Sequence, residues 1–265
     1  MTATPMPLSS PALETRLATT AHDLRAAQHL RYKVFVEELG ADGPDVDHTA
    51  QLECDTHDPD YDHLILVDPT RDPATLSHVV GVYRLMPGER AEAAGGFYCA
   101  AEYDLSPLLT SGRRLLELGR SCLHPDVRGG PGLLQLWRGL ADYAEARGIE
   151  VMFGVASFHG TDPAPLAHPL AFLHHHHLAP PALRVTARPP DAVSMDLLPP
   201  DAIDRRAAAR AIPALLKSYL RLGGKVGQGA WIDHAFNTID VCLIVDLAEV
   251  SESARTLYAG DRAGA

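Results

Sequence analysis

The chain has 265 residues, of which 46% are hydrophobic and 22% are charged, and its formal net charge is −11. This composition is typical of a globular protein with a substantial core, and it excludes a wholly disordered chain. The acidic balance argues against a general nucleic-acid binder. No segment approaches the roughly 18 uninterrupted apolar residues of a membrane helix, and the N-terminus lacks the pattern of a secretory signal. We therefore expect a cytoplasmic protein.

Apolar residues predict a series of helices and strands along the chain. From residue 21 to residue 39 they recur at helical spacing, and Gly40 ends that pattern. A loop rich in Asp, Gly and Pro follows, and apolar runs then predict strands. In chain order these strands are residues 63–68, 77–86, 115–123, 151–157, 230–233 and 238–245, with shorter ones at 185–187 and 194–197.

The clearest helix covers residues 132–147, where large apolar side chains fall on one face and Gly148 follows as a cap. It lies between strands 115–123 and 151–157. That order predicts a β-α-β unit inside a mixed α/β sheet. Further helical segments are expected at residues 102–109, 169–176 and 207–222, the last of them interrupted by Pro213.

The predicted organisation is a single domain. The first residues, MTATPMPLSSPALETR, are rich in Pro, Ser and Thr, and the pattern weakens again after residue 248. We therefore expect a flexible N-terminal tail over 1–20, one domain over 21–250 and a C-terminal tail over 251–265. The chain has four cysteines without C-x-x-C spacing, which indicates free thiols. Cys122 is predicted to be a buried small hydrophobic residue rather than a nucleophile.

An acidic cluster precedes the first predicted strand. Glu53, Asp55 and Asp58 follow an E-x-D-x-x-D spacing that can direct carboxylates into one pocket. Such a pocket would suit a cationic amine or a hard metal ion, and His57 and His63 add ligands for a transition metal. A solvated turn is the alternative interpretation.

Glu117 lies inside an apolar strand, where a carboxylate is costly unless it is paired or functional. It could act as a general base toward an amine, directly or through a water, or form an ion pair across the sheet with Arg84. Strand alternation places Glu117 and Gly119 on one face and Leu118 and Arg120 on the other.

Arginines accompany these carboxylates in apolar segments. Arg31 lies four residues before Phe35 on the predicted helix, and Arg84 lies in the strand VVGVYRLM. Each could be a surface cation beside the core. With the acidic cluster, however, they could also form a buried polar network.

Two further motifs invite a binding interpretation. The turn 124–132 (HPDVRGGPG) leads into a helix and could offer backbone N–H groups to a phosphate, although many such turns contain Gly. The tract His174–His177 invites a metal site. Adjacent residues on a helix do not share a face, so we favour a structural role and predict no metal.

Basic residues gather in one segment near the C-terminus. Between residues 205 and 225 there are six basic residues and no acidic one. Such a surface could receive an acidic protein or an anionic bilayer, or it could be a solvated helix face. Its members are Arg205, Arg206, Arg210, Lys217, Arg221 and Lys225.

Four features follow one another along the chain. They are the spacing Arg31-x-x-x-Phe35, the acidic cluster, Arg84 and the spacing Glu117-x-x-Arg120. This series resembles the acyl-homoserine-lactone synthases, which have the GNAT acyltransferase fold. Longer segments resemble the bacterial ornithine N-alpha-acyltransferases of ornithine-lipid synthesis even more closely. These segments, spread over about residues 20–247, include FYCAAEYDLSPL, LELGRSCLHPDVRGG, LLQLWRGLADY and LLKSYLRLGGKVGQGAWIDHAFNTIDVCL.

The resemblance implies an α/β, GNAT-like acyltransferase fold, with a mixed, mostly antiparallel central sheet flanked by helices. It implies transfer of a 3-hydroxy fatty acyl group from acyl carrier protein to the alpha-amine of L-ornithine, which would give a lyso-ornithine lipid. The acyl-phosphopantetheine arm would arrive on the carrier protein, cradled between strands 115–123 and 151–157. No other cofactor is expected. Arg128-Gly-Gly-Pro-Gly-Leu departs from the usual GNAT phosphate signature, which fits a carrier-bound donor.

The resemblance also suggests roles for residues of this chain. Glu117 would be the general base, with Arg120 beside it as a second catalytic residue. The basic segment would dock the acyl carrier protein or contact the inner face of the plasma membrane. The acidic cluster would receive the second cation of ornithine or pair with the arginines, and Arg31 or Arg84 would hold the substrate carboxylate. The expected substrate-binding residues are Arg31, Phe35, Glu53, Asp55, Asp58, Arg84 and Ser157.

Two alternatives share this fold. An acyl-homoserine-lactone synthase would need S-adenosylmethionine as the acceptor. Another N-acyltransferase would use a different amino acid, such as glutamine. The later segments, especially LLKSYLRLGGKVGQGAWID, favour the ornithine family.

Overall fold

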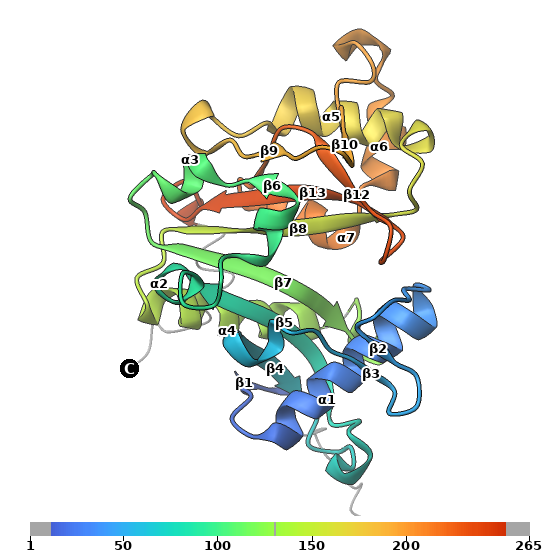
Figure 1. Cartoon of the computed structure of the whole chain (residues 1–265), viewed down its shortest axis with the longest axis vertical. Helices are drawn as coiled ribbons and strands as arrows, with labels where there is room; N and C mark the ends of the chain where they lie inside the picture. The colour runs from blue at the N-terminus through green and yellow to red at the C-terminus, as the bar shows by residue number, and fades with distance from the viewer. Residues whose placement is uncertain (1–11, 130, 253–265) are drawn as a thin grey trace, which may run out of the picture.

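The computed structural model describes residues 12–129 and 131–252 (Figure 1). At its centre is a mixed sheet of nine strands in the order β1-β4-β5-β7-β8-β13-β12-β10, with β11 paired to β13. Only β7 and β8 pair in parallel among the described strands. The sheet strands are β1 (Glu14–Leu17), β4 (Asp62–Val67), β5 (Val79–Pro87), β7 (Leu115–Leu123), β8 (Val151–His159), β10 (Ala192–Val193), β11 (Lys225–Val226), β12 (Ala230–Asp233) and β13 (Thr238–Asp246).

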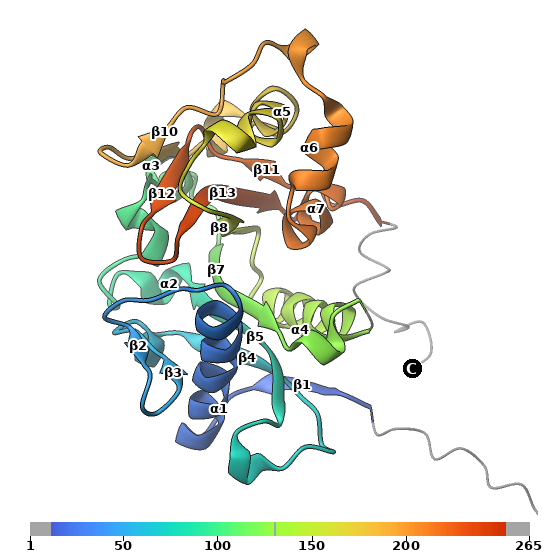
Figure 2. The ribbon, with the colours of Figure 1, turned by 90° about the vertical axis from the view of Figure 1, so that its right-hand side faces the viewer.

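Helices cover both faces of this sheet. Figure 2 shows α1 on one side of the lower strands and α4 on the other, with α7 beside the upper strand β13. The helices are α1 (Ala21–Arg31), α2 (Gly88–Ala91), α3 (Ser106–Leu109), α4 (Gly132–Ala146), α5 (Ala167–His177), α6 (Arg205–Ala211) and α7 (Ala214–Arg221). Two small ribbons pair β2 (Val46–Asp47) with β3 (Leu52–Glu53) and β6 (Tyr103–Asp104) with β9 (Thr186–Ala187).

The predicted β-α-β unit is present as β7, α4 and β8. The large apolar face of α4 packs on the sheet because Leu136, Trp137, Leu140 and Tyr143 recur at helical spacing and are all buried. A helical crossover is what joins two parallel neighbouring strands.

The first predicted helix, 21–39, is divided into two parts. Thr20 caps α1 by accepting a hydrogen bond from the Asp23 amide, and Ala26, Ala27 and Leu30 pack on the sheet. From Tyr32 to Glu38 the backbone is a π-helix, η1. Such wider turns are frequent at functional sites.

Several boundaries differ from those predicted. Residues 14–17, assigned to the N-terminal tail, pair with β4 as an edge strand. Residues 194–197 are not a strand, and the short strand lies instead at β10. Helix 207–222 is two helices, because Pro213 has no amide hydrogen to continue the first one. Of the predicted C-terminal tail, residues 253–265 lie outside the described residues.

The four cysteines are free thiols, as predicted. Cys122 is 7% exposed and packs under α1, and burial raises the pKa of its thiol to about 12. A thiol held neutral in this way fits the prediction of a packing residue. No helix among the described residues is long and apolar enough to cross a membrane.

Candidate active site

β7 and β8 pair only over their first three residues and then separate. The last pair is Glu117 with Phe153, and Gly154 follows immediately. A Cβ atom at Gly154 would lie 2.1 Å from the carbonyl oxygen of Leu118. Only glycine therefore allows the two strands to stay this close at the point where they begin to diverge.

A cavity of about 250 Å³ occupies the gap between the separating strands. One part is lined by core side chains that pack around α7, including Met152, Leu216 and Tyr219. The other part is lined by aromatic and charged side chains: Phe35, Tyr98, Arg120, Asp233, Phe236 and Asp240. The cavity thus joins an apolar chamber to a charged one through the sheet.

Three of the predicted site residues line this cavity: Phe35, Arg120 and Ser157. Phe35 comes from the π-helix and meets the ring of Phe236 at 6.2 Å. Arg120 lies between two rings, with its guanidinium carbon 4.8 Å from the centre of Tyr98 and 4.5 Å from that of Phe236. Such stacking favours a fixed cation at the charged end.

The prediction that Arg120 shares a face with Leu118 was wrong. Leu118 packs in the core below the sheet, whereas Arg120 bonds to Glu53 and Asp55 on the α1 side. The reason is local: Arg120 has a φ of 48°, and the pairing of β5 with β7 shifts register beside it. A bulge of this kind turns one side chain to the opposite face.

The predicted arginines and carboxylates form one buried network. Arg31 donates to the Asp58 carboxylate at 2.7 and 2.9 Å and also bonds the Glu53 carboxylate. Arg84 lies 2.6 Å from the Asp55 carboxylate and 3.1 Å from Asp58. These side chains are buried, so the interpretation as a solvated turn is wrong.

Arg120 closes this Arg–carboxylate network. Its Nε and Nη2 atoms lie 3.1 Å from Glu53 and from Asp55 respectively. Three guanidinium groups then face three carboxylates, so their formal charges cancel. Burial alone would raise the pKa of Asp58, but the charges of Arg31 and Arg84 hold it well below its usual range. The acidic cluster pairs with the arginines, and it has no free negative charge for a substrate.

Glu117 lies apart from the cavity. Its carboxylate accepts hydrogen bonds from the Tyr61 hydroxyl and from the backbone amides of Tyr98 and Cys99, at 2.9 and 2.8 Å for the amides. It is 2% exposed, it does not line the cavity, and it makes no ion pair with Arg84. This geometry does not support the predicted general base. It makes Glu117 the anchor of the 3₁₀ helix η4 (Tyr98–Ala101), which carries Tyr98 to the cavity.

A second acidic cluster escaped the sequence analysis. Glu102, Asp233 and Asp240 each place a carboxylate oxygen within 4.8 Å of the others, and all three side chains are buried. Burial, with the charges of Asp240 and Asp233, raises the pKa of Glu102 to about 9. Burial also raises the pKa of Asp240 to about 6. The only sequence signal was the placement of acidic residues in apolar segments, FYCAAE and TIDVCLIV.

Comparisons with known proteins agree with this architecture. A family model described as "Acetyltransferase (GNAT) domain" matches residues 30–138. An L-ornithine N(alpha)-acyltransferase from Rhodobacter capsulatus is 58% identical, covering 92% of this chain and 94% of that protein. Another, from Brucella abortus, is 42% identical and covers 94% and 90%. The chain belongs to the L-ornithine N(alpha)-acyltransferase family.

Solved structures confirm the predicted GNAT-like fold of this acyltransferase. FeeM, an N-acyl amino acid synthase from uncultured soil microbes, matches with a TM-score of 0.54 and 12% identity, covering 92% of this chain and 98% of that one. TofI, solved in a ternary complex with an inhibitor and MTA, matches with a TM-score of 0.52 and 14% identity, covering 95% and 98%. At such identities the likeness concerns the fold alone.

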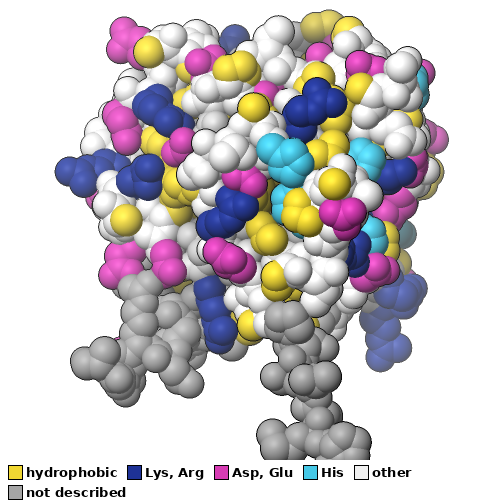
Figure 3. All heavy atoms as spheres, turned by 90° about the horizontal axis from the view of Figure 1, so that it is seen from below, with side chains coloured by type: hydrophobic (Ala, Val, Ile, Leu, Met, Phe, Trp, Pro, Cys, Tyr) yellow, Lys and Arg dark blue, Asp and Glu magenta, His cyan; other side chains and the backbone are white. Residues whose placement is uncertain are grey.

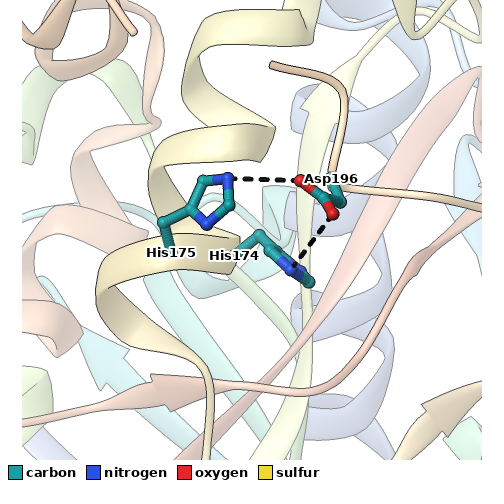
Figure 4. A group of neighbouring side chains, drawn as sticks. All are labelled: His174, His175 and Asp196. Atoms are coloured by element: carbon teal, nitrogen blue, oxygen red, sulfur yellow. Dashed lines mark ion pairs between the residues drawn. The ribbon is translucent and has the colours of Figure 1, made fainter. Parts of the chain in front are cut away.

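The histidine tract of this acyltransferase lies on α5, away from the cavity. His174 and His175 both direct a ring nitrogen at Asp196, at 3.9 and 3.2 Å (Figure 4). His175 also lies 3.0 Å from the carbonyl oxygen of Leu198. These contacts attach the segment after β10 to α5. The same three side chains have ligand atoms within 4.8 Å of one another and could hold a metal ion, so the absence of a metal stays a prediction.

The predicted basic segment forms part of the surface beside the apolar chamber. Its side chains come from α6, α7 and β11, and all are exposed except Lys217, which is half-buried. On α7, Leu215 and Leu216 line the cavity and Lys217 of the basic segment follows them directly. The basic surface therefore adjoins the cavity wall. The face in Figure 3, below the view of Figure 1, instead mixes basic and acidic side chains.

Proposed function

We propose that this acyltransferase moves a 3-hydroxy fatty acyl group from acyl carrier protein to the α-amine of L-ornithine, giving a lyso-ornithine lipid. The observation that supports this proposal is the cavity through the sheet, with an apolar chamber on one side and a charged one on the other. Acyl transfer to an amino acid needs both environments, and they must meet at the thioester.

The gap between β7 and β8 suits a pantetheine arm. Beyond Phe153 the two strands no longer pair, so their facing backbone groups are free to bond an extended ligand. N–H groups at this point can also stabilise the oxyanion that forms when the thioester carbonyl is attacked. The acyl chain would then occupy the apolar chamber around Met152 and Leu216.

The chemistry is direct aminolysis of the thioester. The neutral α-amine donates its electron pair to the carbonyl carbon and forms the C–N bond. The C–S bond then breaks, and the departing sulfur takes up the proton that the nitrogen loses. No acyl-enzyme is needed, which fits the neutral, buried thiol of Cys122.

Two tyrosines favour a hydroxylated acyl chain. The hydroxyl groups of Tyr83 and Tyr219 lie 2.9 Å apart in the apolar chamber, and Trp137 donates its indole N–H to Tyr83 at 3.1 Å. Ser121, which also lines the cavity, acts on the Tyr83 hydroxyl as well, so a small polar group lies among mostly apolar side chains. A 3-hydroxyl group on the donor could join this hydrogen-bonded set without leaving a buried polar group unpaired.

Arg120 is the residue we assign to the carboxylate of the amino-acid substrate. It lies at the charged end of the cavity and is fixed by stacking and by the Arg–carboxylate network. A planar guanidinium recognises a carboxylate well. Arg31 and Arg84, the two arginines expected to hold that carboxylate, belong to the same network but do not line the cavity, whereas Arg120 does.

The basic surface is our candidate for docking the carrier protein. Its charge complements an acidic partner, and it adjoins the apolar chamber that would receive the acyl chain. The same surface would allow peripheral contact with an anionic membrane face, where a lipid product could leave.

Product analysis tests this function. Purified protein is incubated with 3-hydroxypalmitoyl acyl carrier protein and, separately, with ornithine, lysine, glutamine or S-adenosylmethionine, and products are read by mass spectrometry. We expect an N-acyl adduct with ornithine. An adduct with glutamine only, or a lactone from S-adenosylmethionine, would reassign the acceptor. No adduct from folded protein and an active donor would refute acyl transfer to these acceptors.

A further inference from the structure

The second acidic cluster is an incomplete binding site. Glu102 follows η4, Asp233 ends β12 and Asp240 lies on β13, so three separate elements bring their carboxylates together. Asp233 and Asp240 line the charged end of the cavity, whereas Glu102 does not line it but has a carboxylate oxygen within 4.8 Å of theirs. Glu102 and Asp240 are each 3% exposed.

Two of these three carboxylates keep a buried oxygen without a partner, whereas Asp233 Oδ1 accepts the amide N–H of Phe236 at 2.9 Å. Glu102 Oε2 and Asp240 Oδ1 are buried and have no hydrogen-bond partner among the described residues. The hydroxyl oxygen of Thr238, which also lines the cavity, has no hydrogen-bond partner either, although Thr238 and Ser157 lie near enough to Asp240 to favour its charged form. Buried polar atoms are rarely left without partners, so these atoms point to a ligand that supplies donors.

A cation is the ligand that this group of acids favours, because a positive charge beside Glu102 and Asp240 would lower their raised pKa values and allow both to ionise. The cluster groups three acidic side chains, and none of them forms an ion pair with a basic side chain among the described residues. An ammonium group offers three N–H donors in a compact cation. Three carboxylates around one point offer the matching acceptors, and burial strengthens the attraction.

We propose that the cluster of Glu102, Asp233 and Asp240 binds the side-chain ammonium of the amino-acid acceptor, and so selects a diamino acid. The inference rests on the proposed function, because it places the acceptor in this cavity with its carboxylate on Arg120. It assigns the second cation to a cluster other than Glu53, Asp55 and Asp58, whose charges are already paired. An acceptor without the second amine would leave these carboxylates unpaired and is therefore rejected.

The test compares acceptors and variants with the full-length enzyme and acyl carrier protein donor. L-Norleucine has a methyl group where ornithine has its side-chain ammonium, so it reports the α-amine reaction without the second cation. We expect wild-type kcat/KM to favour ornithine over norleucine by more than about 100-fold. In Glu102→Gln and Asp240→Asn this ratio should fall at least tenfold, mainly through a higher KM for ornithine.

Matched variants and a second readout keep this test decisive. Glu92→Gln and Asp201→Asn alter exposed side chains of the same types and should keep the wild-type ratio. Calorimetric titration of ornithine into each protein measures binding apart from turnover, and circular dichroism verifies folding. Loss of ornithine binding in the folded cluster variants, but not in these controls, is the expected result.

The outcomes separate the two proposals. If the wild-type enzyme acylates no ornithine, the proposed function fails and the inference fails with it. If it prefers ornithine but Glu102→Gln and Asp240→Asn keep the ratio, only the inference is overturned. Equal losses of kcat with both acceptors would make the cluster a base for the reacting amine and would also overturn it. So would a stoichiometric bound metal whose removal by EDTA abolishes activity.

Discussion

Gly154 lies against the backbone carbonyl of Leu118, so close that a single added carbon would stand 2.1 Å from that oxygen. This contact marks the last point at which β7 and β8 touch before the cavity opens. The close approach therefore fixes where the sheet separates and where the thioester can be held.

Gly154→Ala should destabilise the protein and abolish acyl transfer. The Leu118 oxygen is backbone, so the strands must move apart, at a cost of about 3 kcal/mol. Thermal unfolding and product formation measure both effects. Gly96→Ala is the control, because Gly96 also has a positive φ but has open space around it. Equal losses in both variants would attribute the effect to backbone conformation rather than to the contact.

Glu117→Gln should lower stability without removing a base. The amide of Gln offers one acceptor oxygen, whereas Glu117 accepts from the amides of Tyr98 and Cys99 and from Tyr61. We expect a loss of about 2–3 kcal/mol in the free energy of unfolding. The pH profile of the remaining kcat/KM should keep its shape.

The control for that variant is Glu92→Gln, on the exposed segment after α2, which should leave stability unchanged. If Glu117→Gln loses the part of the kcat/KM pH profile that reports a basic group, the anchoring role of Glu117 is contradicted. Such a loss would restore the role of general base that the sequence suggested.

Glu102→Gln should stabilise the ligand-free protein at alkaline pH. Glu102 faces Asp233, Asp240, Cys242 and Arg120, and its pKa is raised from 4.5 to about 9. As the pH rises, Glu102 loses its proton in the unfolded chain at a lower pH than in the folded protein. The free energy of unfolding therefore falls as the pH rises from 4.5 to about 9. Removing the acid should gain roughly 3 kcal/mol at pH 7, from about 1.4 kcal/mol per pKa unit.

Thermal unfolding at pH 5 and pH 8 measures this effect. We expect a melting temperature higher by about 5 °C or more at pH 8 and almost unchanged at pH 5. An equal difference at both pH values would indicate that the gain does not come from ionisation of Glu102. Added ornithine should raise the melting temperature of wild type and not that of Glu102→Gln.

Tyr219→Phe should reduce the preference for a 3-hydroxyacyl donor. It removes one member of the hydroxyl pair with Tyr83 and leaves the apolar wall intact. The ratio of kcat/KM for 3-hydroxypalmitoyl and palmitoyl carrier protein should fall about fivefold, the value of one hydrogen bond. Tyr143→Phe, whose hydroxyl bonds Asp62 away from the cavity, is the control. Equal losses with both donors would contradict recognition of the hydroxyl.

Charge reversal of Arg206, Arg210 and Arg221 together should raise the KM for acyl carrier protein about tenfold or more. Interactions between exposed charges are screened by salt, so the difference from wild type should shrink as ionic strength rises. Arg25→Glu changes an exposed residue on α1 and should leave that KM unchanged. An unchanged KM in the triple variant would refute docking at the basic surface.

Much of this protein could be predicted from its sequence. Periodicity placed the β-α-β unit and the core face of α4, because a helix buried on one side repeats its apolar residues every three or four positions. Long segments such as LELGRSCLHPDVRGG also indicated the ornithine N-alpha-acyltransferase family. Arginines and acids inside apolar segments predicted a buried network, since a charge is stable there only when it is paired.

Only the tertiary structure decided which groups meet. Periodicity could not reveal the bulge that turns Arg120 toward Glu53, or the loop amides that occupy Glu117. Nor could it bring Glu102 beside Asp240, because these residues lie on elements far apart in the chain. The spacing of residues predicts which of them share a face of one helix or strand. A binding site also depends on which strands pair and which loops contact them, and the packing of the whole chain determines these contacts.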